Sequence, residues 1–146
     1  MFSHITNTKR SDAVDYEIYQ IRLADKTPVL TVRPATELNS SYYSELLRTK
    51  SGKQIMRSNG HLDPKKLEQH RLTEVKLFAK HVVVGWRNVI DEAGNEPPFT
   101  KDNVAEFLEA TVKLDPSIFD ELRGFCASSA NFIDGDIDPV EDVAKN

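Results

Sequence analysis

Histidines are the residues of this chain best suited to bind a metal ion, but their spacing argues against that use. His70 and His81 lie eleven residues apart on one expected helix, about three turns, which is too far for both to bind one ion. The only cysteine is Cys126, and the His-Glu-x-x-His pattern is missing. We therefore expect histidines on the surface or on helix flanks, and neither a metal nor a cofactor.

Two other patterns could support chemistry, and both fall short. The stretch DGDIDPVEDVAK at residues 134–145 alternates aspartates like a calcium loop. However, Pro139 stands at the position that needs glycine, and Lys145 stands where a bidentate glutamate is required. No serine has the flanking glycines of a nucleophile elbow, and Cys126 falls on the expected buried face of a helix without a basic neighbour in sequence. We therefore expect a protein that is not an enzyme.

A basic segment is the remaining candidate for ligand contact. Residues 48–63 are predicted to form a loop rich in glycine, serine and positive charge. The candidate contacts to phosphate, or to an acidic partner, are Lys50, Lys53, Arg57, Lys65 and Lys66. The segment lacks the interleaved aromatic side chains of a single-strand binder, and the whole chain carries a net charge of −4. We therefore do not expect nucleic acid as a partner, and keep a nucleic-acid-binding regulator only as an alternative function.

The length predicts one domain, 1–146, and the composition is that of an ordinary soluble protein. The single cysteine indicates a reducing compartment, and we expect no membrane span because no apolar stretch is long enough. Positive and negative charges are unevenly placed: the net charge is +7 over residues 48–90 and −10 over residues 91–146. This division indicates either complementary charges within one molecule or head-to-tail association into a homo-oligomer. Two differently solvated faces would explain it equally well.

The elements that must position these residues are mainly helical. We predict a mainly α fold, α+β by count, with about four helices, an N-terminal β-hairpin and a short β-turn or hairpin between the central and third helices. The hairpin covers residues 15–34, and Ser40 or Ser41 is expected to cap the first helix. Pro64 opens a 20-residue central helix that ends at Gly85, Thr100 caps the third helix, and Asp115 starts the fourth. Residues 1–13 and 134–146 are expected to be frayed termini.

The link between the central and third helices is the most distinctive passage. In VVVGWRNVIDEAGNEPPFT, residues 82–100, Asp91 can accept hydrogen bonds from the backbone that follows it. Gly94 and Asn95 tolerate positive φ, and the two prolines aim Phe99 back toward the core. We therefore expect Trp86 and Phe99 to meet across the turn and to join two helices rigidly.

The order of these residues resembles phage tail assembly chaperones of long-tailed phages. The resemblance rests on nine positions: Gly85, Trp86, Asp91, Gly94, Asn95, Pro98 and Phe99, followed by the Asn131-Phe132 pair that closes the last helix. It implies a non-catalytic protein of the infected bacterial cytoplasm that binds the tape-measure protein, helps to recruit the tail-tube protein and is absent from the mature virion. It also implies that a longer, frameshifted form of the chain is a partner.

A chaperone of this kind needs exposed apolar side chains on a stable scaffold. The partner-binding candidates are Tyr42 and Tyr43, with Phe78, Trp86 and Phe119 if these are exposed, and the basic residues named above. The principal alternative is a structural morphogenesis protein, such as a head–tail connector or a tail-completion subunit.

Overall fold

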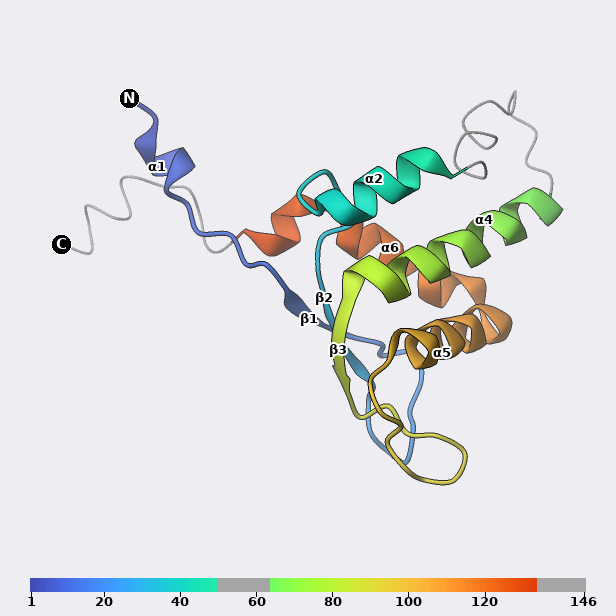
Figure 1. Ribbon diagram of the computed structural model, residues 1–146. Coiled ribbons are helices and arrows are strands. Elements are labelled where there is room, and N and C mark those ends of the chain that lie inside the picture. Colours follow the sequence, from blue (N-terminus) through green and yellow to red (C-terminus); the bar gives the residue numbers. More distant parts are fainter. Residues whose placement is uncertain (50–63, 134–146) are drawn as a thin grey trace.

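The fold is a small sheet packed against a group of helices. A computed structural model describes residues 1–49 and 64–133. Its three antiparallel strands, β1 Val14–Glu17, β2 Val29–Val32 and β3 Val83–Arg87, are ordered β1-β2-β3, and the longer helices gather on one side of them (Figure 1). This helix-rich α+β arrangement confirms the predicted fold class.

The predicted hairpin is present, with shorter strands than expected. Pairing runs from Val14 opposite Val32 to Glu17 opposite Val29. The chain then leaves the sheet at Ile18, which is buried in the core, and residues 18–28 form a connection that turns tightly between Leu23 and Lys26. Cross-strand bonding continues one residue past the strands, because the Ile18 N–H donates to the Pro28 carbonyl at 2.9 Å.

The prediction that the central helix ends at Gly85 is wrong. Helix α4 covers Pro64–Leu77, a π-helical turn η1 follows at Phe78–Val82, and the chain then enters β3. Gly85 and Trp86 therefore lie within a strand, opposite Thr31 and Leu30. The run of valines at 82–84 favours extended backbone, and pairing with β2 decides the outcome. The expected cap of this helix, Asp63, lies outside the described residues.

The starts of the other helices follow their capping residues. Helix α2, Ser40–Arg48, is capped by Asn39, which accepts from the Tyr42 backbone N–H, so the expected cap at Ser40 or Ser41 is wrong by one or two residues. The Ser41 hydroxyl instead donates to the Asn39 side chain. Thr100 caps α5, Lys101–Leu114, and Asp115 caps α6, Pro116–Ala127, both as predicted. A short 3₁₀ turn, η2, follows α6 at Ser129–Phe132.

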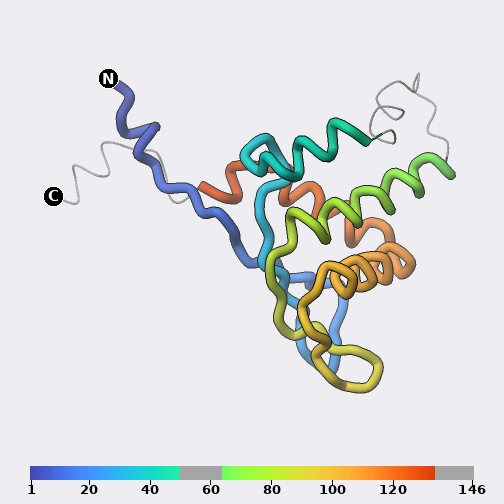
Figure 2. The backbone as a smooth tube through the Cα atoms, viewed as in Figure 1, coloured from blue at the N-terminus to red at the C-terminus, as the bar shows by residue number. Residues whose placement is uncertain are grey.

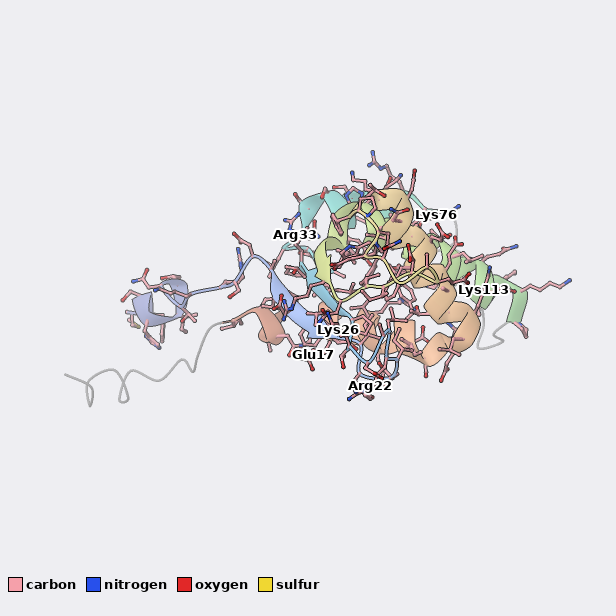
Figure 3. All side chains as sticks on the ribbon, turned by 90° about the horizontal axis from the view of Figure 1, so that it is seen from below. Glu17, Arg22, Lys26, Arg33, Lys76 and Lys113 are labelled. Carbon is pink, nitrogen blue, oxygen red and sulfur yellow. The ribbon has the colours of Figure 1, made fainter. Side chains whose placement is uncertain are left out.

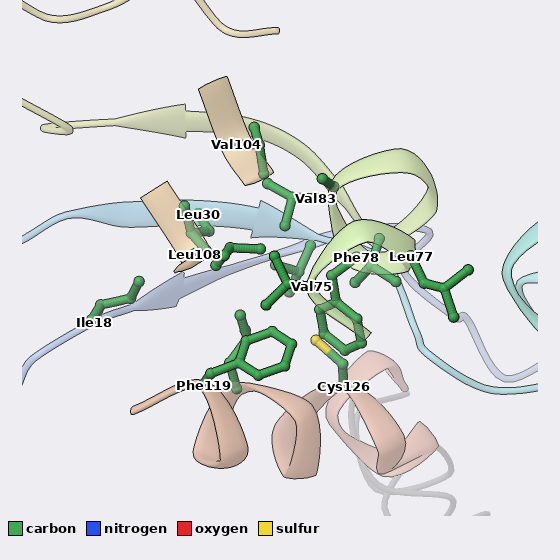
Figure 4. Packing of buried hydrophobic residues seen from close by; sticks show 14 of the residues in the cluster. Ile18, Leu30, Val75, Leu77, Phe78, Val83, Val104, Leu108, Phe119 and Cys126 are labelled. Carbon is green, nitrogen blue, oxygen red and sulfur yellow. The ribbon is translucent and has the colours of Figure 1, made fainter. Parts of the chain in front are cut away.

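The core lies between the sheet and these helices. Figure 4 shows side chains of the strands, η1, α4, α5 and α6 packed together. Phe78 is central to it, because its ring meets Tyr42 edge-on at 5.8 Å and Phe119 at 5.3 Å between centroids. Both Phe78 and Phe119 are fully buried. This packed body is the scaffold on which any exposed apolar surface must rest.

The N-terminal segment stands apart from the core. Residues 1–13, expected to fray, contain one helical turn, α1 Ser3–Thr6, without a buried residue. The segment is attached through a β-bridge between Arg10 and Ile133 and a hydrogen bond from the Ser11 N–H to the Phe132 carbonyl, 2.7 Å long. Figures 1 and 2 show the preceding residues projecting from the body. We call residues 1–9 the N-terminal arm.

Candidate functional site: an apolar groove beside Trp86

The turn after β3 is held by the aspartate that the sequence singled out. The Asp91 carboxylate accepts from the backbone N–H groups of Ala93 and Asn95 at 3.0 and 2.9 Å. The Asp91 N–H donates to the Asn95 carbonyl, and Gly94 takes a positive φ of 84°. The link is a turn and not a second hairpin, because the strand before it pairs with β2 instead. Asn95 is not in the left-handed region, since only Gly94 and Asn88 have positive φ in this stretch.

Trp86 is the centre of an aromatic cluster. Its ring meets Phe99 at 5.5 Å and 84°, and Phe107 of α5 at 5.9 Å and 77°. Both are edge-to-face contacts, which aromatic rings favour. The expected meeting of Trp86 and Phe99 is therefore present. Phe99 remains 40% exposed, so it covers the indole instead of entering the core.

The exit of the turn is tied to the next helix. Thr100 caps α5, and the Asn103 side chain donates to the Pro98 carbonyl at 2.9 Å. These contacts hold the segment that carries Phe99 against the first turn of α5. The Trp86 cluster is therefore fixed from both sides, by β3 and by α5.

A groove of about 940 Å³ opens beside this cluster. Three segments enclose it: the 18–28 connection, the turn after β3, and α5 (Figure 1). Its apolar surface is formed mainly by Ile21, Leu23, Trp86, Ile90, Phe107 and Leu114. We call it the Trp86 groove.

Charge is placed unevenly around the Trp86 groove. The residues that line it include three with carboxylates, Asp91, Glu92 and Glu106, and one with a guanidinium, Arg22. Figure 3 shows Arg22 on the 18–28 connection, at the edge of the body. An open apolar trough with a mainly acidic lining suits the apolar face of an amphipathic segment with basic flanks.

Sequence reasoning found only part of this groove. It identified Trp86 and the turn, but it missed Ile21, Leu23 and Leu114. Phe107, Thr111 and Leu114 follow one another at helical spacing, and this stripe extends the buried face of α5 to an end that is 68% exposed at Leu114. An apolar stripe on α5 that continues past the core is the sequence feature that could have predicted the groove.

The structure places four of the predicted partner-binding residues. Tyr42 is only 4% exposed, and its hydroxyl donates to Glu74 at 2.9 Å, so it is not available to a partner. Phe78 and Phe119 are likewise buried, whereas Tyr43 is half-buried on α2. Lys65 and Lys66 lie exposed on the first turn of α4, and Lys50, Lys53 and Arg57 lie outside the described residues.

The Asn131-Phe132 pair has a structural place. The Asn131 side chain donates to the Phe125 carbonyl at 2.9 Å, near the end of α6. The Phe132 ring is buried, 6.0 Å from that of Phe125. The pair therefore closes α6 and also receives the N-terminal segment through the Phe132 carbonyl.

Polar side chains on α4 and α6 form a second cluster. Arg71 forms a two-point ion pair with Asp120, and Arg123 contacts Asp120 at 3.5 Å and donates to His70 at 3.2 Å. Burial lowers the pKa of His70, and the charge of Arg123 acts in the same direction. The Arg71–Asp120 pair joins the basic middle to the acidic end, so part of the charge division is complementary within one molecule.

His70, His81 and the Cys126 thiol lie in separate surroundings. His81 pairs with Glu45 at 2.7 Å, whereas His70 contacts Arg123. Over residues 1–49 and 64–133, no group of three or more His, Cys, Asp or Glu side chains could hold a metal ion. Cys126 is fully buried, and burial raises the pKa of its thiol to about 12. The aspartates of the 134–145 stretch lie outside the described residues.

Comparison with known proteins decides the family. The family model described as YdaY prophage protein matches residues 38–146, three quarters of the chain. The chain belongs to the YdaY prophage protein family. It is therefore a phage-related protein. The match includes α2, α4, β3, α5 and α6 and leaves out the N-terminal arm, β1 and β2.

Other comparisons add nothing to this assignment. No curated protein and no solved structure matches the chain. Within the described parts of the chain, none of the helices has the length and apolar character needed to cross a bilayer.

Proposed function

We propose that this prophage-family protein is a tail assembly chaperone, and that it holds an apolar helical segment of its client in the Trp86 groove. The observation that supports the proposal is the groove itself, an open volume of about 940 Å³ with aromatic and aliphatic walls on a packed scaffold. Apolar grooves of this size commonly accept ligands or helices by burying the apolar face of the guest.

The chemistry of the groove restricts the client. Trp86 and Phe107 offer broad aromatic surface, which contributes strongly to binding when a partner covers it. Asp91, Glu92 and Glu106 favour a guest with lysine or arginine beside its apolar stripe. A tape-measure protein, which is long and helical, is the client that the resemblance to tail assembly chaperones implies.

Further parts of the proposal follow from the same resemblance. The protein acts without catalysis in the cytoplasm of the infected host, helps to bring tail-tube subunits to the tape-measure protein, and leaves before the virion is complete. A longer, frameshifted form would add a second binding module to the same scaffold.

Co-purification of the tape-measure protein tests the proposal. We expect the wild-type chain to keep a co-expressed tape-measure protein soluble, and Leu114→Glu to lose that activity by at least tenfold. Leu114 is 68% exposed, so the change leaves the core intact. Leu47→Glu is the matched control, because Leu47 is 58% exposed on α2 and does not line the groove.

Two outcomes would contradict the proposal. Equal binding by Leu114→Glu and wild type would remove the groove from client recognition. Detection of the chain in purified virions by mass spectrometry would favour the alternative of a head–tail connector or tail-completion subunit that stays in the particle.

A further inference from the structure

The N-terminal arm carries apolar side chains that its own chain leaves uncovered. Phe2 is 61% exposed and Ile5 is 50% exposed. They stand three residues apart around α1, so they lie on the same side of that helical turn. Exposed apolar residues are ordinary one at a time, but a projecting segment that presents two together resembles the guest of an apolar groove.

The charge of the arm is opposite to that of the Trp86 groove. Residues 1–9 contain Lys9 and His4 and no acidic residue. The groove is lined by three carboxylates and one guanidinium. Apolar and charged surfaces of the arm and the groove are therefore both complementary, which is the pattern that fixes a specific contact.

Placement of the arm points to a groove on another molecule. The arm leaves the body where Arg10 bridges Ile133, beside the end of α6. The Trp86 groove lies around the turn after β3, at the opposite end of the body (Figures 1 and 2). Figure 3, viewed from below, likewise shows α1 standing clear of the body.

We propose that the N-terminal arm of a second copy of this chain occupies the Trp86 groove when no client is bound. Phe2 and Ile5 of one copy lie against Trp86, Phe107 and Leu114 of the next, and Lys9 lies near the acidic lining. Such a contact joins two different surfaces, so each copy still has a free arm or a free groove for a further copy.

The proposal rests on the proposed function for its consequence. If the groove binds the client, then the arm and the client compete for one surface. The arm would shield the apolar groove in the free protein, and a client that binds more tightly would displace it and dissociate the self-associated form.

Disulfide trapping tests the contact directly. Ile5→Cys and Ala110→Cys place thiols on the arm and on the exposed, groove-lining face of α5. The native Cys126 is fully buried and should not react. Mixing the two single variants under mild oxidation should yield a disulfide-linked heterodimer, whereas Ile5→Cys mixed with Leu47→Cys should yield at least tenfold less.

Sedimentation measures the same contact without a cross-link. We expect wild-type self-association to weaken at least tenfold in Phe2→Ala/Ile5→Ala and in Leu114→Glu, and to weaken with added salt. All three substituted side chains are exposed, so the variants should remain folded. A monomeric wild-type chain at every concentration, or an intramolecular disulfide in the chain carrying both Ile5→Cys and Ala110→Cys, would overturn the proposal.

A basic amphipathic peptide separates failure of this inference from failure of the proposed function. An 18-residue leucine–lysine helix serves as the probe. We expect it to bind the arm variant, Phe2→Ala/Ile5→Ala, at least as tightly as wild type, and to dissociate wild-type oligomers. Self-association that persists at saturating probe would overturn competition for the groove. Normal tape-measure binding by a chain that shows no arm contact would leave the proposed function standing alone.

Discussion

Coupling between Trp86 and Phe99 is the most direct test of how the groove wall is built. The perturbation is a double-mutant cycle of Trp86→Leu, Phe99→Leu and the two together. The rings meet edge-to-face at 5.5 Å and 84°, a geometry that contributes roughly 0.5–1.5 kcal/mol beyond burial. Because Phe99 is 40% exposed, we expect a coupling energy in the lower part of that range, about 0.5–1 kcal/mol.

The two single variants should differ in how much they lower the free energy of unfolding. Trp86→Leu also loses the contact with Phe107 at 5.9 Å, so we expect it to destabilise the fold by about 2 kcal/mol, within the common range for partly buried positions. Phe99→Leu should cost less than about 1 kcal/mol, because much of its ring is already in water.

Urea unfolding followed by far-ultraviolet circular dichroism measures all four proteins. Trp86 is the only tryptophan, so its fluorescence cannot follow the variants that lack it. A control cycle pairs Trp86→Leu with Phe125→Leu, since the ring contacts of Phe125 are with Tyr16 and Phe132. That cycle should be additive within about 0.3–0.5 kcal/mol. If the Trp86–Phe99 cycle is equally additive, the reasoning that the turn is braced by this ring pair is refuted.

Two further predictions concern buried ionisable side chains. Tyr42→Phe removes the hydroxyl that donates to the buried Glu74 carboxyl at 2.9 Å, and we expect a loss of about 1–3 kcal/mol in urea unfolding at neutral pH; stability equal to wild type would contradict the role of this bond, and Tyr43→Phe is the control. Burial raises the pKa of the Cys126 thiol from 9.0 to about 12. The buried neutral thiol therefore contributes fully to the free energy of unfolding below pH 9. This contribution is lost as the pH rises toward 12, at about 1.4 kcal/mol per pH unit at most. Burial also raises the pKa of Tyr16, from 10.0 to about 12, but Tyr16 adds to this loss of stability only above about pH 10. Cys126→Ala should therefore flatten the decline in stability between pH 9 and 10, measured by urea unfolding in reductant. An unchanged slope would show that the thiol is not the cause.

Local signals in the sequence determined the starts of three described elements. Pro64 begins α4, Thr100 caps α5, and Asp115 with Pro116 starts α6. The starts of α5 and α6 depend on hydrogen bonds between residues two or three positions apart, and Pro64 already has the φ of a first helical residue, so a sequence displays all three directly. The Asp91 turn belongs to the same class, because its carboxylate accepts only from the next four residues.

Tertiary structure decided the end of the central helix. Residues 82–84 are three consecutive valines, which periodicity alone assigned to the helix. Their backbone instead becomes extended because β2 offers a pairing partner for β3, roughly fifty residues earlier in the chain. Pairing between strands so far apart in the chain cannot be detected in a short window of sequence.

The groove is also a product of tertiary structure. Its walls come from residues 21–23, 86–97 and 103–114, and only packing of α5 against the sheet and η1 brings them together. Similarly, the aromatic side chains of Tyr42 and Phe119 are typical of a contact surface, yet both are buried in the core. The sequence by itself determined which residues begin helices and form the turn, since those choices are local; which apolar side chains remain for a partner was decided by what the rest of the chain left uncovered.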